Sequence, residues 1–511
     1  MYTNSSPNVI LMTDCTDAMA MQKTVGVYKV AYELRQIGIQ VAVIHHLNIF
    51  SIEEINSLLT KLISPSTLFV GFNNVFYQPF LDSSASAYAG IKSCPPGSML
   101  PHGLQFNKEL KLLIKEANTN CQLVLGGPTA HDASYNGDFD YIVSGYADKS
   151  IVNLAKHLMD KSIKLEQSYK SIHGPYIIND SKAAGFDFPS STIRYEEHDA
   201  ILPDEVLTLE VSRGCIFKCS FCSFPLNGKS KFDYIKNEEL LLAELMDNYT
   251  RFGTTKYVFS DDTFNDSIEK CEMISRVAAA LPFKLEWWAY LRLDLLAAHP
   301  QTIDMLFDSG LRGCYFGIET FNQKAGSAIG KGAKRERLID TLRLIKTKWG
   351  ASVMLHGSFI FGLPHESMES MKQTISFLLG PDCPLDSWNL RTLVIKADSV
   401  NWVSGFLSDI DINYEKYGYE KVGTRGTTMV WKNEFCDSVE IDNMIKIAIS
   451  ESEANGKRVS CTYAFWLSGL GFELSTLSNK YIHEIDWKSI RAKRKVREQE
   501  YKHKLYTTLR I

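Results

Sequence analysis

The stretch "RGCIFKCSFC", residues 213–222, places Cys215, Cys219 and Cys222 within eight positions of a chain that holds 11 cysteines among 511 residues. The spacing C-x3-C-x2-C lets three thiolates on one tight loop serve a single metal centre. A structural zinc site uses four protein ligands, and no second CxxC or His-x3–5-His pair is present to complete one. A four-iron cluster held by three thiolates instead leaves one iron open to a substrate. The loop therefore predicts an iron–sulfur cluster.

A predicted strand, "LTLEVS" (207–212), leads into this loop, and further apolar segments with polar or glycine-containing ends follow it. Together with the loop they resemble the radical S-adenosylmethionine (SAM) superfamily, whose loop reads CxxxCxΦC with an aromatic Φ, here Phe221. The resemblance covers roughly residues 200–395 and implies a partial (β/α)6 barrel with its site at the carboxyl ends of the strands. The segments that carry it are "YVFSDDTFN" (257–265), "WWAYLRLDLL" (287–296), "RGCYFGIET" (312–320) and "HGSFIFGLPHES" (356–367).

The resemblance also implies the chemistry. The open iron chelates the amino and carboxylate groups of SAM, and a cluster reduced by an external electron donor cleaves SAM to methionine and a 5′-deoxyadenosyl radical. This radical abstracts hydrogen from a substrate, so the site must exclude water. The positions that the resemblance assigns to SAM are Phe221 (adenine), Ser260 and Asp261 (amino group), Arg292 (carboxylate), Glu319 (ribose or methionine moiety) and Gly362 (adenine).

Several of these positions have a structural alternative. Arg292 can form an ion pair with Asp294 instead of binding SAM, and Glu319 can cap a helix. Asp262 is expected to be a structural or capping residue. Lys331, in the turn "GKG" (330–332), is expected to shape a loop and to reach towards the site.

The first part of the chain alternates apolar, β-branched runs with amphipathic stretches, which is typical of a Rossmann-like, doubly wound parallel sheet. Ligands on such sheets bind at the carboxyl ends of the strands. The expected strands are 8–13, 39–47, 67–72, 121–127 and 140–145, and the expected helices are 23–38, 51–63 and 106–118.

Residues 123–158 of this part resemble the cobalamin-binding domain of one radical SAM class, with a Gly-Gly turn, a "DYIVSG" strand and a following helix. The histidine motif DxHxxG is missing, since residues 13–22 read "TDCTDAMAMQ", and the usual acidic pair after "SG" is replaced. The glycines can also serve only as tight turns. The cobalamin contacts that the resemblance implies are Asn73, Asn74, Gly126, Gly127 and Gly145.

We expect a domain at 1–172, a linker at 173–205, the barrel at 206–395 and a mixed α/β, substrate-shaping segment at 396–511. Residues 488–510 form a basic helix, expected to be solvated; nucleic-acid binding through it is a less favoured alternative. Two further sets are expected to be mainly core residues rather than site residues. They are the aromatic residues Trp402, Tyr419, Trp431 and Trp466, and the cysteines Cys314, Cys383 and Cys461.

The most favoured function is a cobalamin-dependent radical SAM methyltransferase acting on an unactivated carbon or phosphorus centre. The alternatives are a cobalamin-free radical SAM enzyme, which would catalyse another rearrangement, cyclisation or hydrogen abstraction, and a non-catalytic cluster-bearing interaction protein. The net charge of −4, the lack of an export signal and the lack of an apolar run of about 18 residues favour a cytoplasmic protein without membrane segments. Unpaired cysteines fit that reducing compartment.

Overall fold

The computed structural model describes residues 6–13, 21–73, 103–127, 130, 139–166, 168–170, 174–180, 187–223, 232–396, 407–425, 428–454, 465, 467–473 and 486–511. Four residues with expected roles lie outside these ranges, namely Asn74, Trp402, Cys461 and Trp466.

The N-terminal unit is built on a mainly parallel sheet in the order β2-β1-β3-β4-β5-β7-β6. Its register is regular, with Val9 opposite both Val41 and Phe69. The predicted doubly wound sheet is therefore confirmed, with strand ends within a few residues of the expected ones. The first five strands are β1 (Val9–Met12), β2 (Val41–Ile44), β3 (Phe69–Asn73), β4 (Gln122–Gly127) and β5 (Tyr141–Gly145).

Helices cover both faces of this sheet because successive strand residues point to opposite sides. Val9 and Leu11 belong to the core shared with α1 (Val25–Gln36) and α4 (Ser150–Met159). Ile10 and Met12 belong to a second core. The helices of that second face are α2 (Ile52–Leu62) and α3 (Gly103–Ala117).

The expected linker at 173–205 is wrong in its first part. Residues Tyr176–Asp180 form β7, which pairs in parallel with β5, and Ser168–Lys170 form the antiparallel edge strand β6. The apolar run "YII" supplies the buried contact, Ile142 opposite Ile177, but its glycine- and proline-containing surroundings hide this short strand in the sequence. The N-terminal unit therefore extends through residue 180.

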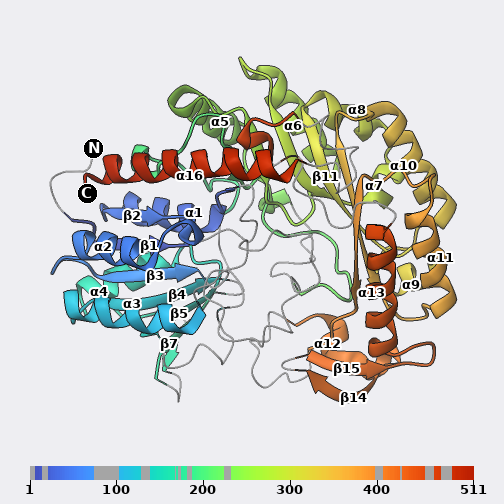
Figure 1. Ribbon diagram of the computed structural model, residues 1–511, viewed down its shortest axis with the longest axis horizontal. Helices are drawn as coiled ribbons and strands as arrows, with labels where there is room; N and C mark the ends of the chain where they lie inside the picture. Colours follow the sequence, from blue (N-terminus) through green and yellow to red (C-terminus); the bar gives the residue numbers. More distant parts are fainter. Residues whose placement is uncertain are drawn as a thin grey trace.

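The central unit is a partial barrel of six parallel strands in the order β13-β12-β11-β10-β9-β8, as predicted. It lies beside the N-terminal unit (Figure 1). Its strands are β8 (Val206–Leu209), β9 (Lys256–Phe259), β10 (Glu286–Leu291), β11 (Leu311–Glu319), β12 (Met354–Phe361) and β13 (Ser387–Thr392). Its helices are α5 (Glu238–Phe252), α6 (Ile268–Ala280), α7 (Leu293–Ala298), α8 (Gln301–Asp308), α9 (Gln323–Ala328), α10 (Arg335–Trp349) and α11 (Met368–Leu379).

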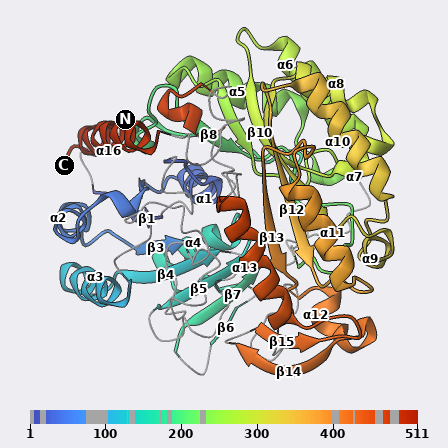
Figure 2. The same cartoon turned by 45° about the vertical axis from the view of Figure 1, so that its right-hand side comes forward.

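The C-terminal segment follows the barrel and includes a two-stranded hairpin, which confirms a mixed α/β segment. This hairpin lies beside the last barrel strands (Figure 2), and Met429 N donates to Ile395 O at 2.8 Å. The elements are α12 (Asp409–Asn413), β14 (Glu420–Arg425), β15 (Thr428–Lys432), α13 (Ser438–Ala454) and α16 (Trp487–Leu509).

Most residues of the basic helix α16 are at least partly exposed, as expected of a surface helix, but one side of the helix is buried, which the sequence does not predict. The helix returns to the N-terminal unit (Figure 1), where Tyr501, Leu505 and Leu509 complete the second core of the sheet. The Tyr501 hydroxyl accepts a hydrogen bond from His45 N at 3.0 Å. Its buried apolar residues are interspersed with basic ones. The sequence therefore predicts a charged helix but does not reveal which side of it is buried. Within the described residues, no helix combines the length and apolarity needed to span a membrane.

Candidate functional site

The three cysteines lie on the loop after β8, at the carboxyl end of the barrel. Gly214 opens the loop with a φ of +97°, a conformation that favours glycine. Cys222 N donates to Cys219 O at 3.0 Å, which closes the turn between the last two cysteines. None of the three forms a disulfide; Cys215 is buried, and Cys219 and Cys222 are half-buried.

Polar groups from neighbouring strands approach these thiols. Arg292 Nη1 lies 3.6 Å from Cys219 Sγ, and the Cys215 thiol lies 3.6 Å from Thr263 Oγ1. Burial raises the pKa of the Cys215 thiol. A bound metal overrides such a shift because a coordinating thiol is deprotonated.

These cysteines fit a cluster better than a single ion. Among the residues that the structure describes, no three His, Cys, Asp or Glu side chains lie close enough together to hold one metal ion. A four-iron cluster does not need such convergence, since its three thiolates bind three different irons. The half-buried positions of Cys219 and Cys222 also leave the loop accessible from one side.

Asp261 has a structural role that differs from the SAM contact expected at this position. Its carboxylate is fully buried and accepts hydrogen bonds from Val211 N at 2.8 Å and Ser212 Oγ at 2.6 Å. It also pairs with Lys270 Nζ at 3.3 Å. Asp261 therefore holds the backbone that enters the cysteine loop.

The two neighbours of Asp261 lie closer to open space. Ser260 is half-buried, and its hydroxyl donates to Leu209 O at 3.2 Å. Burial and the negative charge of Asp261 raise the pKa of Asp262 to about 7. Asp262, which follows β9, is therefore a carboxyl group with a raised pKa, although the sequence predicts only a structural or capping residue.

Arg292 forms the ion pair that the sequence offered as the alternative to SAM binding. Its guanidinium holds Asp294 through two hydrogen bonds, of 3.0 and 2.6 Å, and donates to Gly330 O at 3.2 Å. The ring of Phe217 lies 3.9 Å from its Cζ atom. Arg292 thus braces the cysteine loop against the 330–332 turn, and its fork is already occupied.

Glu319 and Lys331 form a pair at the end of β11. Lys331 Nζ lies 2.8 Å from Glu319 Oε1 and 2.7 Å from Gly317 O, and it approaches the ring of Phe221 at 5.9 Å. Glu319 has a φ of +64°, a strained conformation for a side chain of this kind. The structure therefore brings Glu319, Lys331 and Phe221 together, and a helix cap is not the role of Glu319.

Gly362 connects the end of β12 to the C-terminal segment. Its carbonyl accepts a hydrogen bond from the Tyr419 hydroxyl at 2.7 Å, and Trp431 covers its Cα atom. Tyr419 and Trp431 are 2% and 1% exposed, so the prediction of core packing is confirmed for both residues.

We expect Gly362→Ala to destabilise the protein by about 2–4 kcal/mol, from overpacking plus backbone strain. The new Cβ would lie 2.3 Å from Trp431 Cη2 at a residue whose φ is +82°. Urea unfolding measures the effect. The control is Gly423→Ala, where a Cβ has no atom within 4 Å. Equal midpoints for the two variants would contradict this packing.

Glu366 links the ends of two strands. Its carboxylate accepts hydrogen bonds from Thr320 Oγ1 at 2.5 Å, after β11, and from Gly362 N at 3.1 Å, after β12. Burial raises the pKa of Glu366 from 4.5 to about 7, against the opposing effect of these hydrogen bonds.

The raised pKa predicts a pH dependence of stability. Glu366 binds its proton more tightly in the folded state, so its contribution is complete below pH 4.5 and is lost as the pH rises to about 7. The wild type should lose roughly 3 kcal/mol of its free energy of unfolding over this window, and Glu366→Gln should abolish that loss. Urea unfolding from pH 4.5 to 8 measures the difference between variant and wild type. The control is Glu369→Gln, at an exposed position, whose free energy of unfolding should vary with pH as in the wild type. If Glu366→Gln also varied with pH as the wild type does, the raised pKa of Glu366 would be excluded.

The barrel interior carries a layer of rings at one level of the strands. The register places Tyr290 beside Tyr315, and Tyr315 beside His356. Their ring centroids lie 5.0 and 4.6 Å apart, and Asn389 donates to the Tyr315 hydroxyl at 3.1 Å. Tyr290 is 41% exposed although it lies on a barrel strand, so solvent reaches the space above this layer.

His356 closes this layer on one side. It is fully buried, its Nδ1 lies 2.7 Å from Ser387 Oγ, and its Nε2 has no hydrogen-bond partner within standard geometry among the residues that the structure describes. Burial lowers the pKa of His356 to about 3, so the imidazole is neutral at physiological pH. A neutral ring with one free nitrogen can donate or accept one hydrogen bond, depending on its tautomer.

The carboxyl edge of the N-terminal sheet carries the residues expected to contact cobalamin. Asn73, Gly126, Gly127 and Gly145 end β3, β4 and β5 and are all half-buried. Gly127 and Gly145 have φ angles of +137° and +96°. A Cβ added at Gly126 would have one neighbour within 4 Å, Val143 O at 3.9 Å. Three of the four described rim residues are glycines, so these positions leave room for a broad, flat ligand.

The same edge of the sheet contacts the barrel. Gln22, beyond the end of β1, donates to Thr208 Oγ1 of β8 at 3.1 Å. Asp148, beyond the end of β5, pairs with Arg213 at 2.6 Å. The rim of the N-terminal sheet and the cysteine loop therefore face a common interdomain region.

Sequence reasoning missed several of these residues. The ring layer has a signal, since aromatic or polar residues alternate with apolar ones in "WWAYLR" and recur in the later strands. Glu366 also has a signal in the sequence, because it is an acidic residue close to the end of an apolar strand. Arg213 has no such signal, because its partner Asp148 lies 65 residues away in the sequence.

Comparisons with known proteins agree with this arrangement. Residues 209–378 match the model of the radical SAM superfamily. An uncharacterized methyltransferase of Pyrococcus horikoshii is 31% identical over 182 residues, which are 35% of this chain and 38% of that protein. The chain spans less than half the length of the curated relatives it matches.

Two solved structures share the fold across much of the chain. TsrM from Kitasatospora setae, a radical SAM methyltransferase with tryptophan and a SAM analogue bound, has a TM-score of 0.64 at 14% identity and covers 95% of this chain and 99% of its own. The cobalamin-dependent radical SAM enzyme OxsB has a TM-score of 0.55 at 15% identity and covers 81% of this chain and 56% of its own. Both structures therefore share the fold of this chain over most of its length.

Proposed function

We propose, from the radical SAM domain that residues 209–378 form, that this chain is a cobalamin-dependent radical SAM methyltransferase. The observation that carries the proposal is the contact between two sites. Asp148, three residues beyond Gly145 at the sheet rim, pairs with Arg213, which stands two residues before Cys215.

The cysteine thiolates would hold a [4Fe–4S] cluster that binds SAM and supplies electrons for its cleavage. Around the cluster, Arg292 fixes the Cys219 side of the loop, while Asp261 and Lys270 fix the chain that enters it. Because Arg292 and Asp261 are already paired, and the Gly362 backbone already bonds to Tyr419 and Glu366, the groups that remain for SAM are Phe221, Ser260 and the Glu319–Lys331 pair. Cobalamin at the rim of the sheet would carry the methyl group.

The substrate would be a small molecule bound in the barrel, above the layer of Tyr290, Tyr315 and His356. The exposed ring of Tyr290 offers a stacking surface, and Asn389 and His356 offer neutral hydrogen-bonding groups. TsrM, which shares this fold, has tryptophan bound. We propose a planar, uncharged moiety for the substrate of this chain, in a carbon-methylating reaction.

Anaerobic purification with hydroxocobalamin present tests the proposal. We expect about four irons and one corrinoid per chain, with both absorption spectra in one protein peak. A cluster without stoichiometric corrinoid would favour the cobalamin-free alternative. SAM that remains intact under reducing conditions, with a complete cluster and candidate substrates present, would favour a non-catalytic protein.

A further inference from the structure

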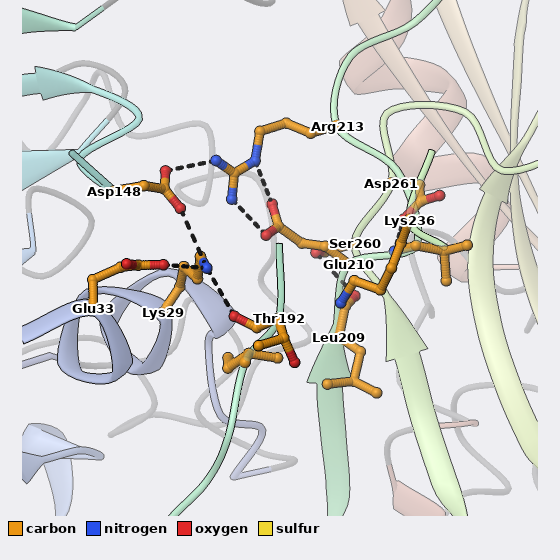
Figure 3. Close-up of polar contacts among 12 residues, drawn as sticks. Lys29, Glu33, Asp148, Thr192, Leu209, Glu210, Arg213, Lys236, Ser260 and Asp261 are labelled. Carbon is orange, nitrogen blue, oxygen red and sulfur yellow. Dashed lines mark hydrogen bonds and ion pairs between the residues drawn. The ribbon is translucent and has the colours of Figure 1, made fainter. Parts of the chain in front are cut away.

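Arg213 is the residue that joins the cysteine loop to the N-terminal unit. It stands two positions before Cys215, and its side chain is 4% exposed. Its Nε and Nη2 atoms donate to Glu210 at 3.0 and 2.6 Å, and its Nη1 atom donates to Asp148 at 2.6 Å. Figure 3 shows the guanidinium between these two carboxylates. One side chain thus binds both the barrel and the sheet rim.

Aromatic side chains enclose this guanidinium. The ring of Tyr146 lies 4.5 Å from Arg213 Cζ, and the ring of Phe188 lies 5.2 Å from it. The backbone of Arg213 is fixed as well, since its N–H donates to Tyr234 O at 2.9 Å. Because water is largely excluded, the charge of Arg213 depends on its two carboxylate partners.

Asp148 has a second cationic neighbour in the N-terminal unit. Lys29, on α1, lies 3.8 Å from Asp148 Oδ1 and donates to Glu33 at 2.5 Å and to Thr192 O at 2.7 Å. Two cations and three carboxylates therefore form one continuous group, which reaches from α1 to the cysteine loop (Figure 3).

An ammonium group could not replace this guanidinium. The fork of an arginine binds one carboxylate through two atoms and a second through a third, whereas a lysine is a single point charge. The group also spans the joint between two units that have separate sheets. The geometry therefore fixes the orientation of the joint in a way that a single ion pair would not.

We infer that Arg213 and Asp148 are positioning residues, which set the separation between the cluster and the cobalamin that we propose at the sheet rim. The inference rests on the proposed function for the identity of the two groups. Neither residue needs to touch a reacting atom. They fix the distance between the sheet rim at residues 145–149 and the cysteine loop at residues 214–222.

Electron paramagnetic resonance tests this inference in protein loaded with a reduced cluster and cob(II)alamin, through the spin–spin interaction between the two centres. We expect one defined separation in the wild type and a broadened distribution in Asp148→Asn and Arg213→Lys, with iron and corrinoid contents unchanged. The control is Asp386→Asn, a similarly buried carboxylate before β13 that pairs with Lys346 of α10, within the barrel unit. If the distribution of separations were as narrow in Asp148→Asn as in Asp386→Asn, the inference would be overturned.

A second measurement does not depend on cobalamin. In cluster-loaded protein without corrinoid, we expect hydrogen–deuterium exchange in residues 145–149 and 210–216 to become about tenfold faster in Asp148→Asn, a change of about 1.4 kcal/mol. Asp386→Asn should leave both segments unchanged. Unchanged exchange in Asp148→Asn would overturn the inference, whereas a wild type that binds no cobalamin would contradict only the proposed function.

Discussion

Cys219→Ala is expected to abolish the cleavage of SAM, because two remaining thiolates cannot hold a four-iron cluster that needs three protein ligands and one open iron. The absorption of the cluster and the iron content should both fall to background. Cys219 is also the thiol nearest to Arg292, at 3.6 Å, so its loss removes the contact that braces the loop. Iron analysis and mass spectrometry of 5′-deoxyadenosine measure the two effects.

The matched control is Cys383→Ser, a half-buried thiol outside the cysteine loop. It should keep full iron content and wild-type cleavage. Iron retained in Cys219→Ala, or lost equally in Cys383→Ser, would contradict the assignment of the loop as the cluster site.

Lys270→Met is expected to cause the largest loss of stability. The Lys270 ammonium is fully buried and lies 3.3 Å from Asp261, 3.0 Å from Asp266 and 2.7 Å from Ser212 Oγ. Methionine would leave two buried carboxylates without a cation, and removal of one partner from such a group costs about 3–5 kcal/mol. Urea unfolding at pH 7 measures the loss.

Lys348→Met provides the comparison, since its pair with Asp304 is exposed and such pairs contribute about 1 kcal/mol or less. If Lys270→Met is too unstable to purify, adding Asp266→Asn should restore soluble protein by removing one unpaired charge. Equal stability of Lys270→Met and Lys348→Met would contradict the buried network beside the cysteine loop.

Periodicity was sufficient to predict five strands of the N-terminal sheet, because each of them is an apolar run with a distinct end. The barrel was predicted from the resemblance of its ordered motifs to the radical SAM superfamily. The missed strand β7 lies in a stretch where glycine, proline and charge mask a three-residue apolar run. The docking of α16 was missed because its four buried residues are spread over a basic sequence.

The candidate site was less completely predictable. The three cysteines are adjacent in sequence, so their pattern alone identifies the loop. The roles of Arg292 and Asp261 depend on partners that the sequence does not place in space, although Asp294 was recognised as one alternative. The interdomain group around Arg213 depends on tertiary contacts throughout.

The most direct test of the central proposal is to quantify S-adenosylhomocysteine by mass spectrometry after one anaerobic incubation of SAM with the reduced protein, loaded with both cluster and cobalamin. We expect one equivalent of S-adenosylhomocysteine per bound cobalamin, with the methyl group recovered on the corrinoid and none formed without cobalamin. Absence of S-adenosylhomocysteine from protein with full cluster and cobalamin contents would contradict a cobalamin-dependent methyltransferase.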